Sequence, residues 1–206
     1  MNRSDLLRRG PLPAALCLLV ALAGCGVAEP PPEIDLEAVL EVTRESLLEA
    51  DAASPEGEID EAGSREALLG LADVLERNYN ARIPALYEAS PISVAARSDA
   101  SLMAVADTDG DREPDEGELP LWLIEIDGEN ARIVATGRSG EVRESGFSGT
   151  SLLAGYLLGS MLSRQRAAGV NTAALAAKRP ISAQQARQAR QAARARAGSG
   201  SFARGK

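Results

Sequence analysis

The chain of 206 residues contains no histidine, only two cysteines, and few aromatic residues, which make up 3% of it. Without histidine it cannot form a Ser-His-Asp or Cys-His catalytic system or a His-ligated zinc site, and it lacks the usual general base near neutral pH. The scarcity of aromatic rings disfavours carbohydrate clefts and platforms for single-stranded nucleic acid, because both rely on ring stacking. These absences predict a protein that is not an enzyme and that has a binding or structural role.

A short hydrophobic segment lies near the N-terminus. Three arginines precede an apolar run, residues 11–24, which is too short to cross a bilayer, since a membrane helix needs roughly 20 apolar residues. The run leads into Leu22-Ala23-Gly24-Cys25. This sequence resembles the lipobox of the bacterial lipoprotein class, in which an aliphatic residue and two small residues precede an invariant cysteine. The alternatives are an ordinary secretory signal with a chance cysteine, or an uncleaved helix.

The lipoprotein resemblance implies that residues 1–24 are a signal peptide and that the thiol of Cys25 receives a diacylglyceryl group. Cleavage before Cys25 then frees its amine for a further acyl chain, such as palmitate. Several acyl chains make a durable membrane anchor, because each buried methylene contributes about 0.8 kcal/mol and a single chain binds only marginally. The class signal for retention in the inner membrane is aspartate after the cysteine, whereas this chain has Gly26. In an organism with two membranes, we therefore expect the protein at the periplasmic face of the outer membrane.

Cysteine chemistry is otherwise excluded. Cys17 lies inside the hydrophobic run and leaves with the signal peptide, so Cys25 would be the only cysteine of the mature chain. A disulfide framework and a Cys-ligated metal site are then impossible, although the compartment would permit disulfides.

The net charge of −8 is unevenly distributed, because the last acidic residue is Glu144 and ten lysines and arginines follow it. We expect a signal peptide (1–24), a proline-rich tether (25–33), a folded acidic domain (34–162), and a basic tail rich in Ala, Gln and Arg (163–206). The tail has no apolar face, which predicts that it is disordered or becomes helical only on a partner. Anionic envelope components such as lipid phosphates or acidic polymers suit it, as does the acidic body of its own or another copy. Nucleic acid is not expected as a partner in this compartment, and a solvated tail without a partner is the alternative.

Hydrophobic spacing predicts an α+β fold, in which N-terminal helices pack on a small antiparallel β-meander. A helix is expected over residues 34–50 with Asp35 as its cap, and a second from the cap Ser64 to just before Pro84. Trp122, Ile124 and Ile126 share one face of the most strongly patterned strand. The expected strands are 92–97, 102–106, 121–126, 131–136 and 141–144, with a hairpin turn at 127–130.

An apolar segment, residues 149–162, predicts a short helix after the sheet. It is too short to span a membrane, so packing on the sheet or at an interface is the main interpretation. It also contains Gly155-x-x-x-Gly159, a spacing that lets two helices approach closely and would permit self-association. Shallow membrane insertion is a third reading of the same segment.

The segment from Asp107 to Glu118 has carboxylates at positions 1, 3, 5, 9 and 12 of twelve. It resembles the Asp-x-Asp-x-Asp calcium loops of EF-hand and related repeat proteins. Ca²⁺ takes six to eight hard oxygen ligands, and alternate residues of a tight loop can direct side chains to one centre. By the resemblance, Ca²⁺ would be bound by the side chains of Asp107, Asp109, Asp111 and Asp115, a bidentate Glu118, and the backbone carbonyl of Glu113.

The segment departs from that pattern in three ways. Arg112 occupies the position of the usual turn glycine, Pro114 occupies the usual aliphatic position, and the strand pattern after Pro120 excludes an exiting helix. We therefore expect a single loop with weak affinity, about 10⁻⁴ to 10⁻³ M, and a structural role for the ion. The alternative is a solvated acidic loop. A separate acidic pair, Glu125 and Asp127, lies on one strand face but lacks the other groups that hydrolysis needs.

Overall fold

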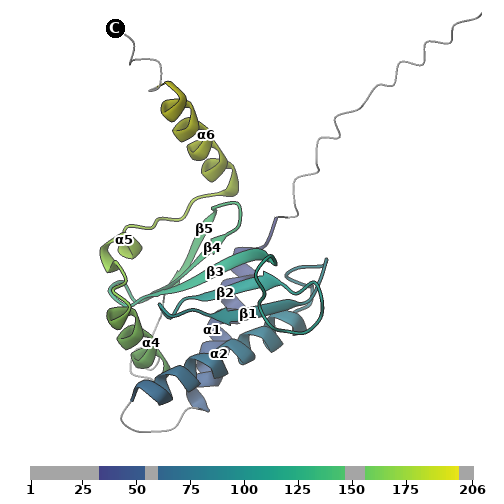
Figure 1. The fold of residues 1–206 in the computed structure, drawn as a ribbon, viewed down its shortest axis with the longest axis vertical. Coiled ribbons are helices and arrows are strands. Elements are labelled where there is room, and N and C mark those ends of the chain that lie inside the picture. The colour runs from purple at the N-terminus through teal and green to yellow at the C-terminus, as the bar shows by residue number, and fades with distance from the viewer. Residues whose placement is uncertain (1–32, 54–59, 147–155, 200–206) are drawn as a thin grey trace, which may run out of the picture. The chain divides into compact units, whose positions relative to one another are not determined.

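The computed structural model describes residues 33–53, 60–146 and 156–199, and the contacts divide the chain after Pro32, so the described residues belong to one compact unit. Among the described residues, two helices come first, five strands follow, and three helices complete the order (Figure 1). The helices are α1 (Leu36–Ala52), α2 (Glu61–Ala81), α4 (Tyr156–Ala167), α5 (Thr172–Ala176) and α6 (Ala183–Ser199). The strands are β1 (Ile92–Ala96), β2 (Leu102–Ala106), β3 (Leu119–Asp127), β4 (Arg132–Gly137) and β5 (Val142–Gly146). The α+β class is confirmed.

The five strands form one antiparallel meander in the order β1-β2-β3-β4-β5. Alternation along β4 separates its two faces, since Ile133 and Ala135 belong to the main core whereas Val134 belongs to a second cluster. On β3, Trp122, Ile124 and Ile126 are all buried, as the sequence predicts. The meander therefore has one face for the helices and a second face that needs separate cover.

Helices α1 and α2 pack on one face of the sheet, α1 against β4 and β5 and α2 against β1 (Figure 1). The aromatic rings of Tyr79 and Trp122 meet edge to face across this contact, with centroids 5.1 Å apart. The hydroxyl of Tyr79 is also within 2.7 Å of Thr43 Oγ1, so one buried aromatic residue joins both helices to the sheet. The predicted helical stripes thus form the main core.

The N-terminal caps agree with the sequence at one helix and differ at the other. The Asp35 carboxylate accepts hydrogen bonds from the backbone N–H groups of Glu37 and Ala38, as predicted for α1. Helix α2, however, begins at Glu61 with Asp60 as its cap, and Ser64, which was the predicted cap, lies inside the helix. Ser64 is buried there, and its Oγ lies 2.5 Å from Ser160 Oγ on α4, so the hydroxyl serves helix packing instead of capping.

The main interpretation of the apolar segment was a helix that packs on the sheet or lies at an interface, whereas helix α4 packs chiefly against helices α1 and α2. Leu157, Leu158 and Met161 are buried in the main core. None of the helices in the described part of the chain is long and apolar enough to cross a bilayer. The proposed close-approach pair is described only in part, since Gly159 lies on α4 and Gly155 falls outside the described residues.

The chain beyond residue 162 differs from the expected disordered tail. Leu175 on α5 and the nearby Ile181 pack on Val134 and Val142, which covers the second face of the sheet at β4 and β5. Ile181 also pairs with Val142 in an antiparallel bridge, and each backbone N–H donates to the other residue's carbonyl. The folded domain therefore extends past residue 162 to the start of α6. The sequence conceals this because two isolated apolar residues in an Ala- and Arg-rich stretch produce no periodicity.

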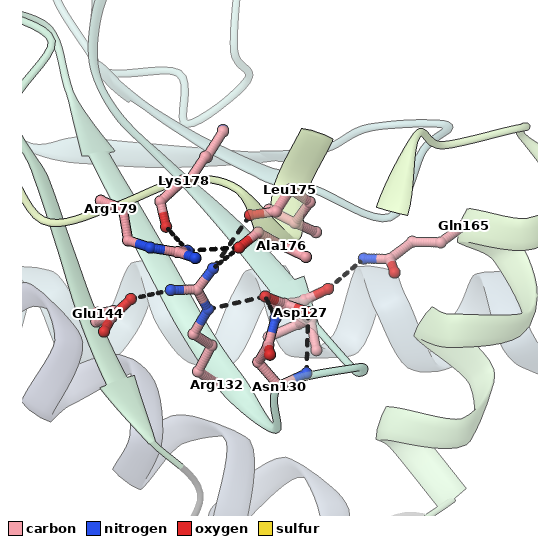
Figure 2. Close-up of polar contacts among 10 residues, drawn as sticks. Asp127, Asn130, Arg132, Glu144, Gln165, Leu175, Ala176, Lys178 and Arg179 are labelled. Atoms are coloured by element: carbon pink, nitrogen blue, oxygen red, sulfur yellow. Dashed lines mark hydrogen bonds and ion pairs between the residues drawn. The ribbon is translucent and has the colours of Figure 1, made fainter. Parts of the chain in front are cut away.

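A buried polar cluster around Arg132, which we call the Arg132 cluster, holds the same segment in place (Figure 2). Its guanidinium forms ion pairs with Asp127, at 2.8 Å, and with Glu144. It also donates to the backbone carbonyls of Leu175 and Ala176, both at 3.1 Å. Arg132 thus joins the β3–β4 hairpin and β5 to the end of α5.

Candidate metal centre

The predicted calcium loop, Asp107–Glu118, connects β2 to β3 and is therefore supported by two paired strands. Asp107 follows β2 directly, is 2% exposed, and donates its backbone N–H to the carbonyl of Pro91. Glu118 precedes Leu119, the first residue of β3. No helix flanks the loop on either side, so the expected departure from a helix-loop-helix unit is confirmed.

Carboxylates of the loop accept hydrogen bonds from its own backbone. Asp107 Oδ1 accepts from Gly110 N at 2.7 Å, Asp109 Oδ1 from Asp111 N at 3.2 Å, and Asp111 Oδ1 from Glu113 N at 2.7 Å. Such local bonds from an aspartate to a backbone N–H two or three residues on are typical of tight turns. The successive acidic residues at alternate positions are thereby oriented by the backbone, not by other side chains.

Glu118 closes the loop. Its Oε1 accepts from Thr108 N at 2.9 Å, and its Oε2 accepts from Asp115 N at 3.2 Å, so its two oxygens contact both halves of the segment. The sequence resemblance assigns a bidentate role to this residue. The structure brings one of its oxygens within 4.8 Å of carboxylate oxygens of Asp107 and Asp109.

Five of the six predicted ligand residues come together through their side chains. Asp107, Asp109 and Glu118 form one group and Asp109, Asp111 and Asp115 a second, with one carboxylate oxygen of each residue within 4.8 Å of the others in its group. Oxygens bound to a single Ca²⁺ at about 2.3–2.6 Å lie at most about 5 Å apart, so these spacings fit that ion. Asp109 belongs to both groups and is the centre of the arrangement. Glu113, predicted to bind through its backbone carbonyl, is absent from both side-chain groups.

Arg112 adopts the conformation that the calcium-loop pattern assigns to glycine. Its φ is +65°, in the left-handed region, and Gly110 and Gly117 have φ of +84° and +115°. A non-glycine residue in this region costs roughly 1–2 kcal/mol. The loop therefore keeps the sharp turn although the glycine is missing.

A carboxylate from α2, Glu76, also faces the loop, and sequence reasoning missed it. Burial has the largest effect on the pKa of Glu76 and raises it, and the charges of Asp73 and Asp107 raise it as well. A hydrogen bond with the Val94 backbone and the charge of Arg112 lower it by less, so the pKa of Glu76 lies above its usual value. Arg112 Nε lies 4.0 Å from Glu76, so the only basic residue of the loop is oriented toward α2. No local pattern links a mid-helix glutamate to a loop far along the chain, and only the packing of α2 on β1 reveals it.

The pair Glu125 and Asp127 is occupied by structural contacts. Glu125 forms an ion pair with Lys178. Asp127 accepts hydrogen bonds from Asn130 and Arg132 (Figure 2). Burial by itself raises the pKa of Asp127, but these hydrogen bonds together lower it by more, so its pKa lies below the usual value. Both carboxylates therefore neutralise cations of the domain.

Comparison of the chain with protein-family models, with curated proteins and with solved structures finds no match. The predicted lipidation residue, Cys25, lies outside the described residues.

Proposed function

We propose that the chain is a lipid-anchored protein of the bacterial cell envelope that acts by binding, without catalysis, and that its Asp107–Glu118 loop holds Ca²⁺. The observation that carries the metal assignment is the convergence of five loop carboxylates in two groups that share Asp109. Hard carboxylate and carbonyl oxygens are the ligands that calcium prefers. The ion would stabilise the β2–β3 connection and hold the domain surface around it in one conformation.

The charge of the loop supports an external cation. Its twelve residues include seven acidic side chains and one arginine, and the ion pair found for that arginine is with Glu76 on α2. The carboxylates oriented toward one another therefore repel without a counter-ion, and a bound divalent ion removes that repulsion.

The proposed anchor is supported by the sequence Leu22-Ala23-Gly24-Cys25 after a short hydrophobic run. Gly26 favours the outer membrane over the inner one where both exist. The described part of the chain begins at residue 33, and seven residues lie between it and the acylated cysteine. The domain would act at the membrane surface.

Calcium binding is tested by titration calorimetry on the chain from Gly26 onward, expressed without the signal and therefore without lipid. This chain retains the whole compact unit that follows Pro32. We expect one Ca²⁺ per chain with a dissociation constant of about 10⁻⁴ to 10⁻³ M. Asp109→Asn removes charge from both carboxylate groups and should weaken binding at least about tenfold.

The matched control is Glu116→Gln, which removes one charge from the same loop at a residue outside both groups. It should change the affinity far less than Asp109→Asn. Equal losses in the two variants, or no calcium heat in the unchanged chain, would refute the metal assignment.

The anchor is tested separately, in cells that express the full chain and are fed a labelled palmitate analogue. The label should enter the protein, stay with the membrane fraction and be absent from Cys25→Ala. A labelled Cys25→Ala chain, or an unlabelled unchanged chain, would contradict the lipoprotein assignment and leave the calcium result unaffected.

A further inference from the structure

Helix α6 is an exposed basic element that adds little to the core. From Arg187 to Ala197 every residue is exposed, and the buried residues of the helix, Ala183 and Ala186, lie in its first turn. Arg190 also packs over Gly140 in the β4–β5 turn, so closely that a Cβ added there would collide with it. The helix is thus attached to the domain at one end and presents the rest of its surface to its surroundings (Figure 1).

The composition of α6 is suited to a charged surface and not to an apolar one. Its 17 residues are Ala, Gln, Arg, Gly and Ser, with four arginines and no acidic residue. Arg187, Arg190 and Arg194 recur at steps of three and four residues and therefore share one side of the helix. Since it has no large apolar side chain, α6 cannot insert into hydrocarbon, and its attraction to a partner would be electrostatic.

The base of α6 lies where the proposed tether enters the domain. Ala183, its first residue, lines one pocket together with Glu33, Ile34 and Asp35. Glu33 is the eighth residue after Cys25, and eight residue steps span at most about 28 Å. Helix α6, with 17 residues, is about 26 Å long. The tether and α6 start from the same place and have similar reach.

We propose that α6 binds the anionic phospholipid headgroups of the membrane to which Cys25 is anchored. The inference rests on the proposed function for the location of that membrane. The several acyl chains proposed at Cys25 already make a durable anchor. The basic helix beside the lipid would therefore act mainly by restricting how the domain is oriented on the membrane.

The acidic body of the domain does not prevent this contact. Charges separated by more than about 8–10 Å are largely screened at physiological ionic strength, and most of α6 extends beyond the residues that hold its base. Lipid is favoured over a soluble acidic polymer because the tether keeps the base of α6 within reach of the headgroups at all times, which raises their effective concentration.

The test is vesicle co-sedimentation of the unlipidated chain from Gly26 onward. One set of vesicles contains equal parts phosphatidylglycerol and phosphatidylcholine, and the other contains phosphatidylcholine alone. We expect binding to the anionic vesicles that falls as salt rises, and little binding to the neutral ones. Each arginine near an anionic surface is worth about fivefold in affinity, so Arg187→Gln with Arg194→Gln should weaken binding about thirtyfold.

The matched control replaces Arg44 and Arg65, two exposed arginines of α1 and α2, by Gln. It changes the net charge by the same amount and should weaken binding less than about threefold. Circular dichroism confirms that each variant is folded. Equal losses in the two double variants, equal binding to neutral vesicles, or no binding to anionic vesicles would overturn the proposal. Because the chain lacks lipid, these outcomes do not depend on whether Cys25 is acylated in cells.

Discussion

The acidic loop and the Arg132 cluster are both rich in carboxylates, but they balance their charge in different ways. In the Arg132 cluster, Asp127 and Glu144 flank a guanidinium that is nearly buried. In the loop, Asp109 and its neighbours are oriented by backbone N–H groups, and the one arginine of the segment contacts Glu76 instead. The first cluster contains its own cation, and the second has the form of a site for an external one.

This difference separates two roles for acidic residues. The Arg132 cluster joins β3, β4 and β5 to the segment around α5, so its loss would release part of the fold. The loop lies at one end of the β2–β3 pair, where its own charge limits its stability unless an ion binds. Substitutions in the two regions should therefore have opposite effects on the ion-free protein.

Arg132→Ala should have the largest effect. It leaves Asp127 buried without its cation, and removal of one partner of a buried ion pair costs about 3–5 kcal/mol of unfolding free energy. Urea unfolding measures the loss. Arg77→Ala is the control, because it removes an ion pair with Glu49 in which both side chains are more than half exposed, and such pairs contribute about 0–1 kcal/mol. Equal losses would show that the Arg132 cluster is not a structural centre.

Acid should also lower the unfolding free energy through the Arg132 cluster, but by less than Arg132→Ala does. The pKa of Asp127 is lowered in the folded state, despite the raising effect of burial, by hydrogen bonds from Asn130 and Arg132. The stability that the Asp127 carboxylate contributes is therefore fully present above its unfolded-state pKa of about 4. It is lost as the pH falls through the lower pKa of the folded state. Urea unfolding between neutral pH and about pH 3 should show a fall in stability that is shallower in Asp127→Asn. An unchanged slope would exclude Asp127 as a source of acid sensitivity.

Arg112→Gly should stabilise the loop by about 1 kcal/mol. Glycine adopts the left-handed φ of this position without steric cost, although its greater freedom in the unfolded chain offsets part of the gain. Thermal unfolding in a chelator isolates the backbone effect from metal binding. Glu116→Gly, at a position with ordinary φ, should destabilise the protein instead. A loss of stability in Arg112→Gly would mean that its contact with Glu76 outweighs the backbone strain.

The smallest effect is expected from Asp111→Asn in a chelator. The amide oxygen can still accept the hydrogen bond from Glu113 N, while one repelling charge disappears, so stability should rise by a few tenths of a kcal/mol. Asp127→Asn, the same chemical change in the Arg132 cluster, should lower stability. The comparison fails if both substitutions shift the unfolding midpoint in the same direction.

The elements with clear periodicity were predictable from the sequence. The apolar stripes of α1 and α2 and the alternation on β3 are periodic, and the hairpin at residues 127–130 has a local turn sequence. The α+β class follows from these patterns. The start of α2 was wrong because Ser64 has the chemistry of a cap but is used for packing against Ser160. The segment around Leu175 and Ile181 was missed because its burial depends on partners on β4 and β5.

In the candidate site, too, local patterns were predictable and contacts with distant parts of the chain were not. Alternate acidic residues along one loop are visible in the sequence, and the structure brings Asp109 together with the others. The left-handed turn at Arg112 was not predictable, since arginine rarely adopts a positive φ. Glu76 depends on tertiary packing alone.

The most direct test of the account is thermal unfolding of the chain from Gly26 onward in calcium and in a chelator. With a dissociation constant of about 10⁻⁴ to 10⁻³ M, about 10 mM Ca²⁺ should add about 1.4–2.7 kcal/mol of stability. That gain corresponds to a rise of about 3–11 °C in the unfolding midpoint for a domain of this size, and Mg²⁺ at the same concentration should produce less. An identical midpoint in calcium and in chelator would contradict the assignment of Asp107–Glu118 as a calcium site.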